Sequence, residues 1–230
     1  MVVIEKDKLT NKYKMEQLLE IMRVLRAPNG CPWDAEQTHE SIRNNLLEEA
    51  YEAADAIDSG DFAALREELG DVLMQVVFHS VMAEEKNNFD FLEVVNEVCE
   101  KLIYRHPHVF GNVQADTSEK VLENWDKLKM SEKHQETYTD TLKSVPKAFP
   151  ALLRAEKVQK RAQKAGVLIT EQEATEKIKN SQNIGEILFA AVALARAKGE
   201  NAEELLYNKT ESFIKDFEKA EKEGRFNENR

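Results

Sequence analysis

Glycine, proline and cysteine are all scarce in this 230-residue chain, and each scarcity excludes a class of protein. The chain has 8 glycines and 5 prolines, about half the usual share, so it offers few of the turns that a sheet-rich fold needs. Its two cysteines, Cys31 and Cys99, are not part of a Cys-x-x-Cys pair. This excludes a disulfide framework and a four-thiolate zinc site.

Long apolar runs are also missing. No stretch of about 18 apolar residues is present, as a membrane-spanning helix would require, and the polar segment 1–14 lacks the apolar centre of a signal peptide. We therefore expect a cytoplasmic protein with no membrane partner. The net charge of −11 also argues against binding nucleic acid over a broad surface, because an acidic protein repels the phosphate backbone.

Several catalytic motifs are absent as well. The chain has no Gly-x-x-x-x-Gly-Lys-Ser/Thr loop, which argues against a P-loop enzyme. It has no His-Glu-x-x-His zinc motif, and it has no nucleophile elbow of the Gly-x-Ser-x-Gly kind. Any catalytic chemistry must come from other residues.

Charged residues make up 33% of the chain, and Glu and Lys, which favour helices, dominate them. The composition and the spacing of apolar residues predict an all-α fold. Cys31 to Asp34 are expected in a loop, with Thr38 or Ser41 capping the next helix. The predicted helices cover residues 15–26, 41–58, 62–85, 90–104, about 117–133, 150–165, 182–198 and 201–223.

Two of these helices, 41–58 and 62–85, carry apolar stripes and are separated only by Ser59-Gly60-Asp61. A turn this short predicts that the two helices pack antiparallel. The stripes expected to be buried comprise Ile42, Leu46, Ala50, Ala53 and Ile57 in the first helix and Phe62, Leu65, Leu69, Val72, Val76 and Ala83 in the second.

The same two helices carry the most informative pattern, which is Glu48-Glu49-x-x-Glu52 followed by Glu68-x-x-Asp71. Residues three or four apart share a helix face, so antiparallel packing can bring the carboxylates together. Clustered carboxylates repel one another unless cations lie between them. Their hard oxygens suit Mg²⁺, with Mn²⁺ as a possible substitute. The alternative is that these glutamates simply lie on solvated helix faces.

Other residues carry weaker signals. Lys101 and Arg105 are four residues apart on one helix and could hold phosphates, although such a pair is also common on a solvated face. Trp33 is a candidate for stacking on a base, with packing as the alternative. We interpret His106 and His108 as structural or capping residues.

The chain also contains an internal repeat, because the segment 68–73 (ELGDVL) is echoed by 183–188 (NIGEIL). Both copies place a glycine inside a helical pattern, where it costs about 1 kcal/mol relative to alanine. In the second copy Asn183 replaces the glutamate and Glu186 replaces the aspartate. We predict two domains, 1–135 and 136–230.

The stretches 30–52, 67–73 and 105–111 resemble the MazG family of all-α nucleoside triphosphate pyrophosphohydrolases. The resemblance implies two MazG-like helical-bundle repeats, the second degenerate and without activity, and a homodimer with a four-helix type of arrangement. It implies hydrolysis of a (d)NTP to (d)NMP and pyrophosphate by metal-activated water. It also implies metal ligands at Glu49, Glu52, Glu68 and Asp71, a catalytic role for Glu48 or Glu52, and substrate binding by Lys101 and Arg105.

Two alternatives remain at this point. One is a helical protein that binds nucleotides for regulation without hydrolysing them. The other is a sibling hydrolase specific for dUTP, dCTP or phosphoribosyl-ATP, which would share the metal site and differ in its base pocket. The sequence does not separate these substrates, because contacts to a base follow no readable spacing rule here. Nor does it indicate whether the cellular role is removal of aberrant nucleotides or control of an alarmone.

Overall fold

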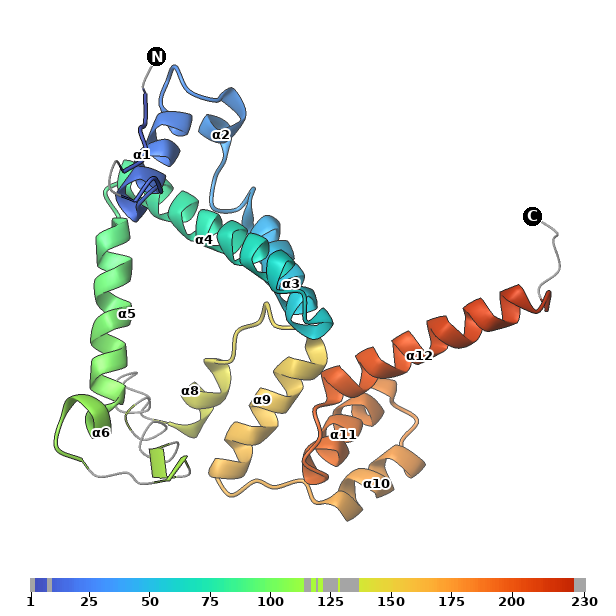
Figure 1. Cartoon of the computed structure of the whole chain (residues 1–230). Helices are drawn as coiled ribbons and strands as arrows, with labels where there is room; N and C mark the ends of the chain where they lie inside the picture. The colour runs from blue at the N-terminus through green and yellow to red at the C-terminus, as the bar shows by residue number, and fades with distance from the viewer. Residues whose placement is uncertain are drawn as a thin grey trace. The chain divides into compact units, whose positions relative to one another are not determined.

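A computed structural model describes residues 3–7, 10–113, 117, 118, 120, 121, 128 and 137–225, and every regular element in this part of the chain is a helix (Figure 1). The predicted all-α class is therefore confirmed. Most of the helix predicted at 117–133 and the predicted domain boundary at 135/136 lie outside the described residues. Among the described helices, none combines the length and the hydropathy that crossing a bilayer requires.

The chain divides into two compact units, Met1–Trp125 and Asp126–Arg230. The first unit contains α1 to α6, and α3 and α4 form its longest helical pair. The bounds of its helices are Met15–Arg26 (α1), Pro32–Glu36 (α2), Arg43–Ser59 (α3), Phe62–Glu85 (α4), Phe91–Arg105 (α5) and Pro107–Phe110 (α6).

The turn between α3 and α4 confirms the predicted antiparallel hairpin. Gly60 ends α3 in the left-handed conformation, with φ of 70°, which glycine adopts at little cost. Asp61 then caps α4, because its carboxylate accepts hydrogen bonds from the amides of Ala63 (2.9 Å) and Ala64 (3.1 Å). Two residues thus reverse the chain.

Two local predictions near α2 are wrong. Cys31 to Asp34 do not form a loop, because Pro32 begins the short helix α2, where its fixed φ suits the first helical position. Neither Thr38 nor Ser41 caps α3, whose N-cap residue is Ile42 without a capping hydrogen bond. Instead the Ser41 hydroxyl accepts a hydrogen bond from the Thr38 amide, and the Thr38 hydroxyl accepts one from the Ser41 amide. These two bonds close the turn before α3.

The hydrophobic core of the first unit lies between α1, the start of α3, the second half of α4 and the start of α5. Its buried side chains are Leu19, Met22, Ile42, Val77, Phe78, Val81, Met82 and Phe91. The predicted stripes on α3 and α4 are buried only in part. Ile57, Phe62 and Leu69 are 61%, 83% and 54% exposed, so the hairpin end carries apolar side chains that this chain does not cover.

Arg26, at the end of α1, holds three helices together. Its guanidinium donates two 2.7 Å hydrogen bonds to the Glu85 carboxylate at the end of α4. It also donates to the carbonyls of Asp34 and Gln37 beside α2 and lies 5.3 Å from the ring centre of Phe78. The Arg26 side chain is only 7% exposed. These hydrogen bonds lower the pKa of the Glu85 carboxyl.

His39 and His79 connect the segment before α3 to α4. Their Nδ1 atoms are 2.8 Å apart, and the ring planes differ by 5°. The ring centroids are 5.1 Å apart, and one Nδ1–H donates a hydrogen bond to the other Nδ1. Burial, and then the charge of His39, lower the pKa of His79.

The second unit is built from α8 (Tyr138–Lys143), α9 (Ala151–Lys164), α10 (Glu171–Asn180), α11 (Ile184–Ala197) and α12 (Ala202–Lys222). Helices α9, α10 and α12 each pack on α11, and α9 also packs on α12. Its buried apolar residues are mostly alanines and valines, so the helices approach closely. These are Val145, Ala174, Ala190, Val192, Ala193 and Ala195.

The Arg26 interactions lead to a stability prediction. Arg26→Met is expected to lower the free energy of unfolding by about 2 kcal/mol, because it leaves Glu85 and two carbonyls without their donor. The control is Arg23→Met, which breaks an exposed pair with Glu84 and is expected to cost less than about 1 kcal/mol. Urea unfolding at pH 7 measures both losses.

The pH dependence of the Arg26 effect follows from the Glu85 carboxyl. Since its pKa is lowered in the folded chain, the pair contributes its full stability above the ordinary value of 4.5. The contribution disappears as the pH falls through the lowered value. The difference between wild type and Arg26→Met should therefore shrink in acid. Equal losses for the Arg23 and Arg26 variants would contradict this assignment.

Candidate metal centre

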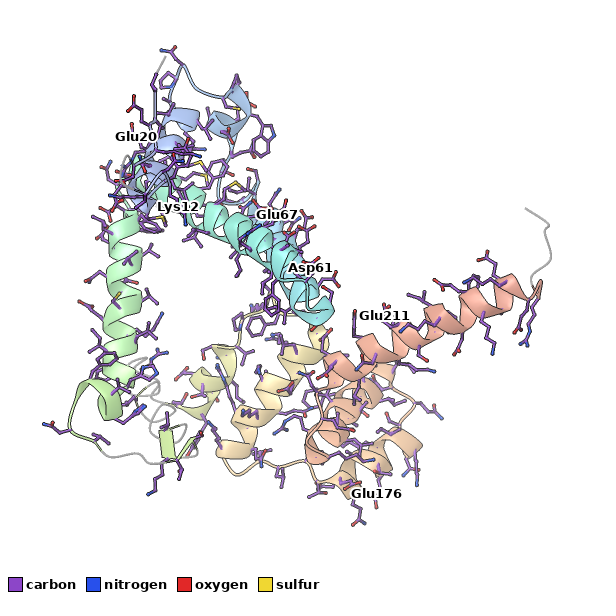
Figure 2. All side chains as sticks on the ribbon, viewed as in Figure 1. Lys12, Glu20, Asp61, Glu67, Glu176 and Glu211 are labelled. Atoms are coloured by element: carbon purple, nitrogen blue, oxygen red, sulfur yellow. The ribbon has the colours of Figure 1, made fainter. Side chains whose placement is uncertain are left out.

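Three carboxylates meet where α3 and α4 face each other. Glu49 comes from α3, and Glu68 and Asp71 come from α4. Each is half-buried, and one oxygen from each lies within 4.8 Å of the others. Asp61 and Glu67, labelled in Figure 2, mark the stretch of α4 that leads into this group.

The register of the hairpin explains why these residues meet. Glu49 and Asp71 are each eleven residues from Gly60, and Glu52 and Glu68 are each eight residues from it. In an antiparallel hairpin, residues equally far from the turn lie opposite one another. The turn therefore places Glu49 opposite Asp71 and Glu52 opposite Glu68.

The electrostatics of the site agree with this register. Partial burial raises the pKa of the Glu49 carboxyl, and the next largest cause is the charge of Asp71, followed by that of Glu52. Loss of hydration also raises the pKa of Glu68, and the nearest charge acting on it is that of Glu52, followed by Asp71. Both carboxyls are thus destabilised in their charged form by the residues opposite them.

Such a group fits a divalent cation. Carboxylate oxygens held within 4.8 Å of one another can all reach a single hard cation, whose charge offsets their repulsion. In the part of the chain that the structure describes, no cationic side chain forms an ion pair with Glu49, Glu68 or Asp71. The donor set is all oxygen, which suits Mg²⁺ or Mn²⁺ better than a thiophilic metal.

The other two acidic candidates lie at the edge of the group. Glu52 is exposed, yet it is close enough to raise the pKa of both Glu49 and Glu68 and to share a hydrogen bond with Glu49. Glu48 is also exposed, and among the described residues it has no interaction with the three half-buried carboxylates. The structure therefore brings Glu52 to the site and leaves Glu48 beside it.

The predicted substrate-binding residues lie on other helices. Lys101 and Arg105 are in the last turns of α5, which begins after the far end of α4 and leads away from the carboxylates (Figure 1). Lys101 is half-buried and Arg105 is 8% exposed. Trp33 lies on α2 with 58% of its surface exposed. Within this chain, none of the three is brought to the carboxylate group.

In the second unit, the residues matching Glu68 and Asp71 are used differently. Asn183 caps α11, because its side-chain oxygen accepts a hydrogen bond from the amide of Glu186 (3.2 Å). The Glu186 carboxylate accepts a hydrogen bond from the Ser181 hydroxyl (2.8 Å). Both side chains therefore stabilise the start of a helix. The group of three acidic side chains found among the described residues belongs to the first unit.

Comparison with known proteins identifies the family of this chain. Residues 37–110 match the MazG nucleotide pyrophosphohydrolase domain, and this range contains Glu48, Glu49, Glu52, Glu68 and Asp71. The chain is 40% identical to a nucleoside triphosphate pyrophosphohydrolase of Escherichia coli strain K12, over 91% of this chain and 88% of that protein.

Two proteins of Thermotoga maritima are also similar. The chain is 36% identical to its nucleoside triphosphate pyrophosphohydrolase/pyrophosphatase MazG, over 90% of this chain and 85% of that protein. Among solved structures, a mazG-related protein of the same organism is 31% identical, with a TM-score of 0.43, over 50% of this chain and 98% of that one.

The repulsion in the site leads to a prediction about stability and metal. Without metal, Glu49→Gln is expected to raise the melting temperature, because it removes one of the opposed charges. Since the pKa of Glu49 is raised in the folded chain, the wild type without metal should lose stability as the pH rises above the ordinary carboxyl value. The variant should lose less.

Added Mg²⁺ should reverse the order, because it stabilises only the chain that binds it. Differential scanning calorimetry with and without Mg²⁺ measures both effects. The control is Glu20→Gln, which removes the same charge from an exposed position on α1. Equal Mg²⁺ responses in the Glu49 and Glu20 variants would contradict a metal site at Glu49.

Proposed function

The chain belongs to the MazG family of nucleotide pyrophosphohydrolases, and on that premise we propose that it hydrolyses nucleoside triphosphates to a nucleoside monophosphate and pyrophosphate. The observation that supports this most directly is the group of opposed carboxylates on α3 and α4. It lies within the residues that match the family domain. A triphosphate needs cations to bind, and this group can recruit them.

We assign the residue roles from their positions in the hairpin. Glu49, Glu68 and Asp71 would hold Mg²⁺, which Mn²⁺ could replace, and Glu52 would complete the ligand set at the edge. A bound divalent cation supplies charge neutralisation for the phosphates and lowers the pKa of water for attack. Glu52 is also the better of the two candidates to accept the proton of the attacking water, because it is adjacent to the ligands and still solvent-accessible.

Phosphate binding requires cationic side chains, and we propose that a second copy of the chain supplies two of them. Lys101 and Arg105 lie on α5, away from the carboxylates of the same chain. Helix α5 also carries exposed apolar side chains, including Leu92 (70%) and Ile103 (53%). In a homodimer, these could pack against the uncovered apolar end of the α3–α4 hairpin and bring the two cations toward the metal site.

Gly70 supports the same homodimer. A glycine inside a helix costs about 1 kcal/mol relative to alanine, and a Cβ atom built at Gly70 meets nothing within 4 Å in this chain. It lies between Leu69 and Leu73, which are 54% and 39% exposed. A partner helix could approach closely at Gly70, because the glycine has no side chain to obstruct it.

For the second unit we propose a role other than catalysis. Asn183 and Glu186, the residues that replace the glutamate and aspartate of the first repeat, are committed to capping α11. The repeat would then be a degenerate copy whose fold persists without its metal ligands. This leaves one active unit per chain.

Product analysis tests the proposed reaction. The full chain incubated with Mg²⁺ and each of the common dNTPs is expected to release the monophosphate and pyrophosphate. Asp71→Asn is expected to lower kcat/KM by at least about 100-fold, since even outer-shell changes at metal sites cost 10–100-fold. Glu20→Gln, on the exposed face of α1, should have no effect. Release of a nucleoside diphosphate and orthophosphate, or binding without turnover, would contradict the proposal. Adding dUTP and phosphoribosyl-ATP to a panel that already contains dCTP identifies a specialised sibling.

The homodimer is tested with Gly70→Leu. In a dissociated chain the new side chain meets open space and improves helix propensity, so the melting temperature at low protein concentration should not fall. In the dimer it would prevent close packing. Sedimentation equilibrium is expected to show a dimer for the wild type and a shift of at least tenfold toward the monomer for the variant. A wild type that stays monomeric at all concentrations would contradict the proposal.

A further inference from the structure

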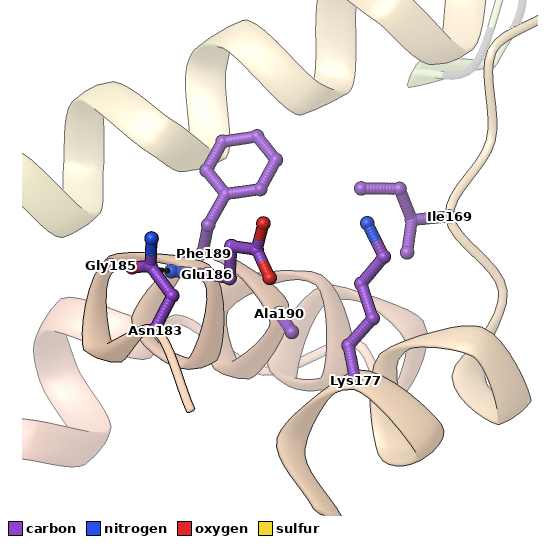
Figure 3. Close-up of a pocket in the computed structure, with 7 residues that line it drawn as sticks. All are labelled: Ile169, Lys177, Asn183, Gly185, Glu186, Phe189 and Ala190. Carbon is purple, nitrogen blue, oxygen red and sulfur yellow. Dashed lines mark hydrogen bonds between the residues drawn. The ribbon is translucent and has the colours of Figure 1, made fainter. Parts of the chain in front are cut away.

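Phe189 of α11 lines two cavities of similar size in the second unit. The first measures about 370 Å³ and is bordered by Lys177 of α10 and Glu186 of α11, shown in Figure 3. One positive and one negative side chain balance each other there. This cavity therefore has no preference for a charged ligand of either sign.

The second cavity measures about 380 Å³, within the range of small-molecule sites. The charged side chains that line it are Lys147, from the segment after α8, and Arg154, from the first turns of α9. No acidic side chain is among its described lining residues. Its local charge is therefore positive, although the chain as a whole carries −11.

The Arg154 side chain has no hydrogen bond or ion pair in the part of the chain that the structure describes. Its Nε atom is buried and makes no hydrogen bond. The other arginines of this unit's core behave differently. Arg161, on the same helix, donates to the Thr141 carbonyl and the Ser144 hydroxyl, and Arg196 donates to the side-chain oxygens of two glutamines. A guanidinium with a buried donor is costly to leave unpaired, and an anion in the cavity would remove that cost.

The rest of the lining is apolar and includes two phenylalanines. Phe149 and Phe189 are 38% and 40% exposed, so their rings are available to a ligand. Ala151, the first residue of α9, also lines the cavity, and a helix N-terminus favours negative charge. The Glu203 carboxylate accepts a hydrogen bond from the amide of Leu153 at this helix end, so one of the amides there is already paired with an acidic group. The cations and the rings together would recognise an anion that carries a flat ring.

We propose that this cavity, lined by Lys147, Phe149, Arg154 and Phe189, binds an organic phosphate with an aromatic ring. The phosphate would lie on the guanidinium of Arg154 and the ammonium of Lys147, and the ring would lie against the two phenylalanines. A nucleoside monophosphate has this chemistry and is also the product of the reaction proposed above. The choice of that ligand rests on the proposed function, whereas the anion site itself does not. The second unit would then sense the product.

Isothermal titration calorimetry on the full chain tests this site. The buffer contains EDTA, so that the metal-dependent site of the first unit does not bind the probe. The probes are dTMP, thymidine, inorganic phosphate and benzoate. We expect dTMP to bind more tightly than each of the other three. Arg154→Ala is expected to weaken dTMP binding about tenfold or more, as loss of a charge-assisted hydrogen bond does.

Two further variants make the result specific. Lys147 is exposed, so Lys147→Ala should keep the fold and still weaken dTMP binding several-fold. Lys160→Ala removes an exposed cation of α9 that does not line the cavity, and it should bind dTMP like the wild type. The proposal is overturned if dTMP does not bind, if thymidine or benzoate binds as tightly, or if Lys147→Ala and Lys160→Ala behave alike. Because no turnover is measured, these outcomes are independent of whether the chain hydrolyses triphosphates.

Discussion

The mutual repulsion of carboxylates on two adjacent helices is the constraint around which the first unit is arranged. Glu49 faces Asp71 and Glu52 faces Glu68 because each pair is equidistant from Gly60. Partial burial, together with this repulsion, raises the pKa values of Glu49 and Glu68, and without a cation the chain gives up stability to keep these charges together. A divalent cation offsets this repulsion, and the same carboxylates then form its binding site.

The surrounding structure holds this hairpin while leaving one end of it uncovered. The core fixes the half of α4 that is remote from the carboxylates, and Arg26 and the His39–His79 pair connect the segments before α3 to that half. Near the carboxylates, Phe62 and Leu69 remain exposed. The rigid half thus positions the ligands, and the exposed half is available to the second copy that we propose.

Local features made much of this fold predictable from the sequence. The helix predicted at 15–26 is observed as α1 and the one at 62–85 as α4. Pro28 and Gly30 follow the first of these helices, and Gly60 and the capping Asp61 precede the second. The carboxylate group was also predictable, because the short turn at Gly60 and Asp61 fixes which residues of α3 and α4 lie opposite one another. Helix α10 was missed although Thr170 and Glu173 form a capping box that the sequence contains.

Long-range pairs were not predictable in this way. Arg26 and Glu85 are 59 residues apart and His39 and His79 are 40 residues apart, and no local pattern connects either pair. The unpaired state of the Arg154 guanidinium likewise depends on what α9, α11 and the segment before α9 place around it. The buried stripes on α3 and α4 were predicted too broadly, because apolar periodicity shows which residues share a helix face and does not show whether the chain covers that face.

The most direct test of the central claim is to locate the metal. Crystals of the full chain grown with Mn²⁺ and a non-hydrolysable triphosphate analogue should show an anomalous peak between the carboxylates of Glu49, Glu68 and Asp71, with metal–oxygen distances of about 2.1–2.2 Å. A peak elsewhere, or no peak at this position under saturating Mn²⁺, would contradict the account.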